Sequence, residues 1–400
     1  MTNISTLNQV IRQTERITAQ QAQLDLLSSQ IATGRKTQQF SGLDNQILSS
    51  QRTRASIDAI DTFIDNMTNS ENRINLTLGT IEEFQQQAGN FAAALATFNQ
   101  ESAQQKGEPV YEDDDPLTPE IENDIIGYTS GELEVDFASL KDLASNLFDF
   151  VSDLLNTRFG DRFILSGADA RTAPIGDTSA LTSAMGSLIN DWKNETITSE
   201  ELLADLNDRT IEDGNTDAIT DTIIGYSATL SSNTAGRTFV RVSEQNELDT
   251  TVFANDEGFR DILVALSYFA SDSLGPIADV YDVDPVTGVR TFVQGGSPGT
   301  NVDEMTDNFY EIFNEISLMV NNALDEIDEQ RFKLETVRSR IDQLKTNYAS
   351  EKNLLFATID QVENVDINEA SLKLNNLITT MEISFAVTGR VQQLSLINFL

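Results

Sequence analysis

Apolar residues recur every seven positions along a C-terminal stretch of the chain. The series is Phe313, Val320, Ile327, Leu334, Ile341, Tyr348, Leu355 and Val362. A second, mostly apolar series follows three residues after the first, and no Pro or Gly interrupts the run. This heptad pattern is typical of a helix that packs against another helix along its length. Because a single helix cannot bury such a stripe alone, the pattern predicts a helical partner.

The N-terminal third provides that partner. A heptad pattern runs from Ile57 to Leu95, and a neighbouring stripe carries Phe63, Phe84, Phe91 and Phe98. We therefore predict a mainly α fold, in which both chain ends form a long antiparallel coiled-coil helical rod with a smaller mixed α/β middle domain. Polar residues interrupt the heptads at Glu71, Gln85, Gln330 and Glu351. They either set the register or lie at solvated edges, and we favour solvated edges.

The two extreme ends predict further helices. Residues 3–33 carry spaced apolar residues, and Gly34 stands where a glycine commonly ends a helix. The last helix, from about Asn368 onward, is apolar around more than one face. Such a surface is expected to be buried by other subunits. We expect subunit contacts at Ile4, Leu7, Ile11, Leu24, Leu27, Ile31, Leu377, Met381, Phe385, Val391, Leu394, Leu396, Ile397, Phe399 and Leu400.

The middle of the chain differs in composition, since all seven prolines lie between Pro109 and Pro298. Residues 105–131 predict a solvated acidic loop, in which a calcium site at Asp113–Asp115 is the less favoured alternative. A helix follows over 132–158. Further on, the pattern predicts short helices at Ser199–Leu206 and Gly258–Ala270, strands at Ile219–Leu230, Arg237–Val242 and Thr250–Phe253, and a turn-rich stretch over 279–285. Trp192 is expected in the core.

These patterns predict three domains. Residues 1–40 with 364–400 would form an inner assembly layer of terminal helices. Residues 41–170 with 301–363 would form the helical rod with a short hairpin. Residues 171–300 would form an acidic mixed α/β outer domain.

Charge and composition exclude several classes of function. The formal net charge of −38 argues against nucleic acid or an anionic membrane as a partner. Cysteine and histidine are absent, which excludes disulfides, thiolate nucleophiles, Cys/His zinc sites and His-based triads. No phosphate-binding loop or nucleophile elbow accompanies the many carboxylates. We therefore expect no enzyme, no cofactor and no metal. We also expect no cleaved secretory signal and no membrane insertion.

Three segments resemble the flagellin superfamily. Residues 29–36, Ser-Gln-Ile-Ala-Thr-Gly-Arg-Lys, resemble its helix-ending connector. Residues 156–167, from Asn156 to Gly167, resemble its helix-to-hairpin segment. Residues 384–400 resemble the C-terminus of the hook–filament junction type. One departure is a single aspartate, Asp44, where the family carries a pair after the first connector. The resemblance covers roughly residues 1–105, 135–175 and 301–400.

The resemblance implies a structural protein of the bacterial flagellum that is exported by the flagellar type III apparatus and lies outside the cell. It would be an adaptor that joins hook to filament and on which flagellin polymerises. Its partners would be copies of itself in a ring or helical assembly, a neighbouring hook-associated protein, flagellin and an export chaperone. The alternatives are a filament flagellin and, from a different class, a non-flagellar coiled-coil adhesin, tail fibre or scaffold.

Overall fold

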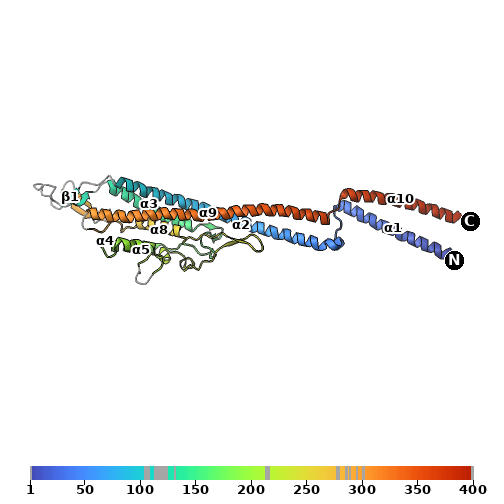
Figure 1. The fold of residues 1–400 in the computed structure, drawn as a ribbon, viewed down its shortest axis with the longest axis horizontal. Coiled ribbons are helices and arrows are strands. Elements are labelled where there is room, and N and C mark those ends of the chain that lie inside the picture. Colours follow the sequence, from blue (N-terminus) through green and yellow to red (C-terminus); the bar gives the residue numbers. More distant parts are fainter. Residues whose placement is uncertain are drawn as a thin grey trace. The chain divides into compact units, whose positions relative to one another are not determined.

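The computed structural model describes residues 2–102, 109–111, 125–129, 132–211, 217–275, 280–283, 287, 290–293, 296–299 and 302–397. The fold is mainly α, as predicted, and its long helices come from both ends of the chain (Figure 1). The chain divides into unit 1, residues 1–65 with 343–400, and unit 2, residues 66–342. Helices α2 (Ile47–Ser102) and α9 (Val302–Glu363) each contribute to both units.

Within unit 2, α2 and α9 are antiparallel and in step. Three side-chain hydrogen bonds cross between them: Arg338 to Asn75 at 3.4 Å, Gln85 to Asp328 at 3.2 Å and Asn99 to Asn314 at 3.3 Å. Ten residues forward along α2, from Asn75 to Gln85, correspond to ten residues back along α9. Gln85 is thus a polar heptad residue that bonds across the seam, whereas Glu351 is exposed.

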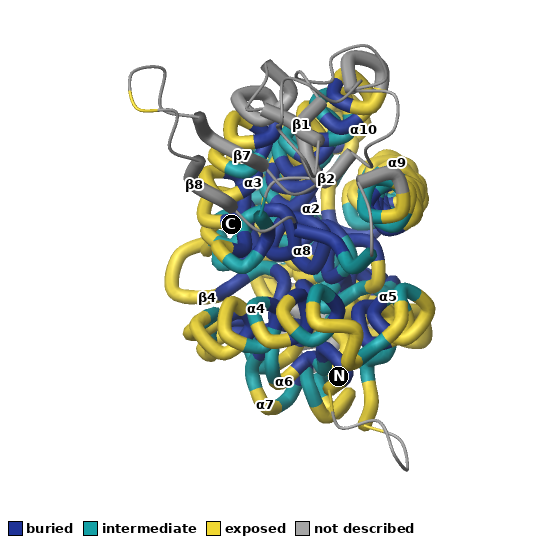
Figure 2. The backbone as a smooth tube through the Cα atoms, turned by 90° about the vertical axis from the view of Figure 1, so that its left-hand side faces the viewer, coloured by how far each residue is buried: buried dark blue, intermediate teal, exposed yellow. Residues whose placement is uncertain are grey.

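Two further helices complete the core of unit 2. They are α3 (Glu132–Leu155) and α8 (Glu257–Ala270). The four helices meet through phenylalanine rings, with centroid distances of 5.0 Å for Phe84–Phe259, 5.7 Å for Phe91–Phe269, 5.8 Å for Phe98–Phe137 and 5.6 Å for Phe269–Phe313. Such pairs contribute beyond the apolar area they bury. Figure 2 shows α8 dark blue beside α2 and α3.

Helix α8 changes the expected relation between the middle segment and the rod. Eleven of its fourteen residues are buried, so it is apolar on nearly all sides and lies within the core. Gly258 marks a close approach to α9: a Cβ built there would lie 2.6 Å from the carbonyl oxygen of Ala323. The boundaries 171 and 300 stay a prediction, but α8 falls between them and shares its core with the rod helices.

The remaining elements of unit 2 are short. The hairpin predicted near residue 160 pairs β3 (Arg158–Phe159) with β4 (Arg162–Phe163). Helices α4 (Ser179–Lys193), α5 (Ser199–Asn207), α6 (Asp221–Ile224) and α7 (Ala228–Ser231) follow, with strands β5 (Phe239–Arg241) and β6 (Glu247–Asp249). The predicted helices at 132–158, 199–206 and 258–270, one of the strands (β5) and the buried position of Trp192 are confirmed.

Two strand predictions are wrong. Residues 219–230 form α6 and α7, because the Thr220 hydroxyl accepts a hydrogen bond from the Ile223 N–H and Gly225 ends the turn at a φ of 95°. Residues 250–253 follow β6 without forming a strand, and Phe253 makes only a single bridge, with Ser166. Helix α4 was not predicted, although Leu181, Met185, Leu188 and Trp192 follow helical spacing on its buried side.

A four-stranded sheet also departs from the predictions. Its order is β1 (Pro109–Tyr111), β2 (Ile125–Thr129), β7 (Val280–Val283), β8 (Arg290–Val293), and only the β2–β7 pair is parallel. Parts of 105–131 and 279–285 are therefore strands, where a loop and a turn-rich stretch were predicted. The run Asp113–Asp115, with its alternative calcium reading, lies outside the described residues.

Candidate assembly surface on the terminal helices

Unit 1 pairs the two ends of the chain. Helices α1 (Thr2–Thr33) and α10 (Ile367–Ile397) run antiparallel and side by side (Figure 1). Toward the end of the pair where both termini lie, the Gln13 side chain donates a hydrogen bond to the Thr388 hydroxyl. The predicted helix over 3–33 is confirmed, and Gly34 ends it at a φ of 71° with its N–H bonded to the Gln30 carbonyl at 2.8 Å. Among the described residues, no helix is long and apolar enough to cross a membrane.

The pair buries only a narrow strip between its helices. Leu27 of α1 and Met381 of α10, both predicted contact residues, are buried inside the chain. Leu24, Ile31 and Leu377 are half-buried. These five residues therefore hold α1 and α10 together within one copy, and their capacity to contact a further subunit is limited.

Other predicted contact residues face outward. Ile11 is 45% exposed and Phe385 is 48% exposed. For Ile4, Leu7, Val391, Leu394, Leu396 and Ile397 the structure gives only a place on the helix, and Phe399 and Leu400 lie outside the described residues. Among the predicted residues whose side chains the structure describes, five form a strip that closes the pair, and Ile11 and Phe385 remain open to a partner.

The structure adds exposed apolar residues that the predicted set omitted. They are Leu26 on α1 and Leu372, Ile378, Ile383 and Val387 on α10, with Leu372 63% exposed. Monomeric proteins rarely expose so many large apolar side chains on one helix, and such surfaces mark interaction sites. The sequence did show apolar residues on more than one face of the last helix. It did not show which of these faces packs against α1 and which stays exposed.

Glu363 ties the end of α9 both to α2 and to the connector between α1 and α2. Glu363, at the end of α9, accepts hydrogen bonds from Arg54 at 2.6 and 3.0 Å and from the Ser50 hydroxyl at 2.5 Å. Its carbonyl also accepts from the Lys36 N–H at 2.8 Å. The bond from Arg54 is the main cause that lowers the pKa of Glu363. The carboxylate is therefore held charged and ties α9 to α2, while the backbone carbonyl of the same residue ties α9 to the connector. We call this set of contacts the joint of unit 1.

Next to this joint the surface is hollowed. A cavity of about 300 Å³ is lined by the end of α1 and by the connector, with Leu26, Arg35 and Lys36 among its residues. The 3₁₀ helix Phe40–Gln46 follows the connector and leads into α2. The lining of the cavity is mostly polar, with Leu26 as the one large apolar side chain among the lining residues.

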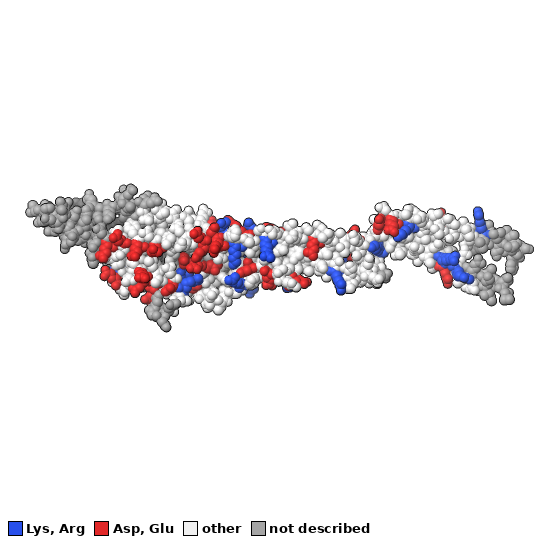
Figure 3. Space-filling model, in the orientation of Figure 1, with Lys and Arg blue, Asp and Glu red and all other residues white. Residues whose placement is uncertain are grey.

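Charge separates the terminal pair from unit 2. Unit 1 has 10 basic and 12 acidic residues, whereas unit 2 has 16 and 52. In Figure 3 the surface around α1 and α10 is mostly white, while red atoms gather over unit 2. Surfaces with little net charge can pack against copies of themselves without strong repulsion, whereas strongly acidic ones repel each other.

Comparison with known proteins connects one part of the chain to flagellar proteins. No curated protein matches the chain. One solved structure, a protein of Vibrio parahaemolyticus described as a flagellar hook-associated protein, is 10% identical with a TM-score of 0.40, over 79% of this chain and 96% of that one. A likeness of that degree carries no argument. Residues 318–400, which span most of α9 and all of α10, match the family model of the bacterial flagellin C-terminal helical region.

Proposed function

We propose that this chain is a structural subunit of the bacterial flagellum that joins hook to filament and offers the surface on which flagellin polymerises. The observation that carries the proposal is the exposed apolar face of α10, which lies inside the region that matches the flagellin C-terminal family model. These apolar side chains are removed from water only when apolar surfaces of other subunits cover them. The subunit is non-enzymatic in this proposal, and copies of it associate through α1 and α10.

The choice of the junction over the filament depends on the last residues. The terminal sequence from Ser384 to Leu400 resembles the junction type more than the filament type. A filament flagellin is the second candidate, since the same region matches the flagellin model. The proposal further includes export through the flagellar type III apparatus, a location outside the cell, and transient binding of an export chaperone to the open face of α10.

The assembly surface is tested by Phe385→Asp, with Asn376→Asp as the matched control. Both variants add one negative charge to an exposed position of α10, but only Phe385 belongs to the apolar face. A charge in an apolar interface without a partner costs several kcal/mol. We expect Phe385→Asp to leave helicity unchanged, to reach the medium, and to be missing from isolated flagella, whereas Asn376→Asp incorporates. Normal incorporation of Phe385→Asp would contradict the proposed surface.

Deletion of the gene separates the two candidate functions. Cells without the junction subunit are expected to carry hooks, to lack filaments and to shed monomeric flagellin into the medium. Electron microscopy of the cells and an immunoblot of the medium would measure both. A shortened or altered filament with other flagellins still assembled would favour the filament subunit. Leu396→Asp, expressed in the deletion strain, is expected to reproduce the deletion phenotype.

A further inference from the structure

Three carboxylates meet where the start of α8 touches α9. Glu257 and Asp261 come from α8 and Glu326 comes from α9, and their oxygen atoms lie within 4.8 Å of one another. The backbones are close here, because a Cβ at Gly258 would lie 2.6 Å from the Ala323 carbonyl oxygen. The two helices therefore cannot move apart to relieve the repulsion without losing this close contact.

Glu326 differs from the other two carboxylates because one of its oxygen atoms is both buried and unpaired. Its Oε2 atom is buried and has no hydrogen-bond partner, and Glu326 is absent from the ion pairs found among the described residues. Burial is the first cause that raises the pKa of Glu326, to about 6, followed by the charges of Glu257, Asp261 and Glu329. Desolvation and like charges both disfavour the ionised form.

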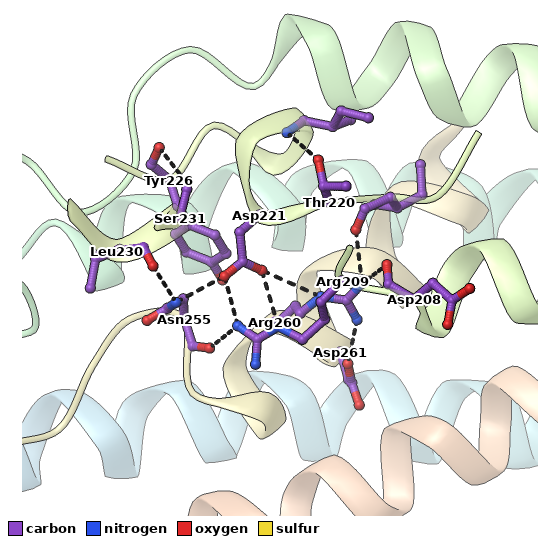
Figure 4. A network of polar contacts seen from close by, with 12 residues as sticks. Asp208, Arg209, Thr220, Asp221, Tyr226, Leu230, Ser231, Asn255, Arg260 and Asp261 are labelled. Carbon is purple, nitrogen blue, oxygen red and sulfur yellow. Dashed lines mark hydrogen bonds and ion pairs between the residues drawn. The ribbon is translucent and has the colours of Figure 1, made fainter. Parts of the chain in front are cut away.

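The neighbouring cations already serve other carboxylates. Arg260 is fully buried and donates from Nη1 to Asp261 at 3.0 Å, while its Nη2 donates to three backbone carbonyls (Figure 4). Arg209 makes two bonds to Asp221, at 2.7 and 3.2 Å. Around Glu326 the charged groups that line the adjoining cavity of about 340 Å³ are Arg209, Asp256, Glu257 and Glu329. Around this cavity the carboxylates therefore outnumber the single cation, Arg209, which is bound to Asp221.

We propose that this contact between α8 and α9 is proton-sensitive: mildly acidic solution tightens it and neutral solution loosens it, through the protonation of Glu326. A protonated Glu326 becomes a hydrogen-bond donor to Glu257 or Asp261 and removes one of the three like charges. For a carboxyl group whose pKa in the folded state is raised, the folded state binds the extra proton, so stability falls as the pH rises through that pKa. The window lies between the usual value of 4.5 and the folded value of about 6.

The inference is independent of the flagellar role, and the full-length chain tests it directly. We would measure amide hydrogen exchange of α8 at pH 5.0 and 7.5, corrected for the intrinsic rates. In the unmodified chain we expect the opening equilibrium of α8 to be about tenfold less favourable at pH 5.0 than at pH 7.5, as a rise in the pKa of Glu326 from 4.5 to about 6 requires over that pH range.

Two variants separate the contact from general effects of charge. Glu326→Gln is neutral at both pH values, so it should be as protected at pH 7.5 as the unmodified chain is at pH 5.0. Glu315→Gln removes the same charge from an exposed position of α9 and should keep the pH dependence. Loss of protection in Glu326→Gln at pH 7.5, or the same behaviour in both variants, would overturn the proposal. Should Glu326→Gln not fold, carboxyl NMR of the unmodified chain decides, since a pKa at or below 4.5 for Glu326 contradicts it.

Discussion

Helix α9 carries one heptad pattern through both units, but the two units use that pattern differently. In unit 2, Phe313 and Ile327 of this series are buried where α8 packs on α9, and Leu334 and Ile341 are fully buried as well. In unit 1, Tyr348 and Leu355 of the same series are only half-buried, and Leu354 is 72% exposed. There the two long helices meet through side-chain contacts such as the stacked rings of Phe63 and Tyr348. A heptad pattern therefore predicts where two helices meet. How deeply the heptad side chains are buried depends on how many further elements cover the pair.

The difference also separates two kinds of stability. Unit 2 contains its own aromatic core and should fold without a partner, in spite of its large negative charge. Unit 1 leaves large apolar side chains in water and is nearly neutral, so it gains most from burial against other copies.

Replacement of residues 176–298 by a short Gly/Ser linker should have the largest effect. From the sequence alone we would expect the rod to keep its helicity. The structure reverses that expectation, because the deletion removes Phe259 and Phe269 from the ring contacts with Phe84, Phe91 and Phe313. We expect loss of cooperative thermal unfolding in circular dichroism. A variant with full helicity and an unchanged melting temperature would show that unit 2 does not depend on α8.

A matched pair on α9 measures the contrast between the units. Leu334→Ala removes a fully buried side chain from unit 2, and such changes cost about 2–5 kcal/mol. Leu354→Ala makes the same change on the same helix at an exposed position in unit 1, where about 0.5 kcal/mol or less is expected. Urea unfolding of the monomer would measure both. Similar costs for the two variants would contradict the division.

The joint of unit 1 should respond to pH in the opposite direction to Glu326. The pKa of Glu363 is lowered below its usual value of 4.5, chiefly by Arg54, so its contribution is present at neutral pH and is lost as the pH falls below about 4.5. Glu363→Gln should weaken the joint by about 1–2 kcal/mol, as the loss of hydrogen bonds to a charged group does. Limited proteolysis of the connector at pH 7 should then be faster. Glu351→Gln, at an exposed position, is the control and should leave the cleavage rate unchanged.

The smallest effect is expected at a helix cap of unit 2. The Thr198 hydroxyl accepts from the Glu201 N–H at 3.2 Å, and the Glu201 carboxylate accepts from the Thr198 N–H at 2.8 Å. Thr198→Ala removes half of this capping box at a cost of about 1 kcal/mol. Because α5 lies at the surface of unit 2, only its own amides should lose protection in hydrogen exchange. Equal loss across α8 would mean that α5 and α8 open together.

The sequence predicted the long helices well because their signal repeats many times. Heptads in α2 and the glycine after α1 predict elements that agree with the structure to within a few residues, whereas α9 begins at Val302, eleven residues before the first heptad residue Phe313. The signal for the middle was short and ambiguous. Val280–Val283 reads as a turn because two aspartates flank it closely, yet the backbone pairs with Arg290–Val293 as a strand. Periodicity cannot predict the structure of such four-residue runs, because it is determined by pairing with residues elsewhere in the sequence.

For the candidate assembly surface, the sequence predicted the apolar composition of the last helix but not which of its residues stay exposed. The apolar excess of the last helix was plain, but which residues close the α1–α10 pair depends on the rotation of the two helices. Met381 and Phe385 lie on the same helix one turn apart, and one is buried while the other is exposed. The carboxylates around Glu326 had no signal at all, because Glu257 and Glu326 are far apart in the sequence and meet only through the packing of α8 on α9.

The step-for-step match between α2 and α9 limits how this chain can change in length over evolution. Asn75, Gln85 and Asn99 each bond a residue of α9 in one unbroken register. An insertion in either helix alone would shift every pair beyond it, so descendants of this sequence should gain or lose residues in both helices together and in whole heptads. Turns that face water, such as the one between β5 and β6 with its exposed residues 244–246, carry no such restriction and are where lineages should differ most in length.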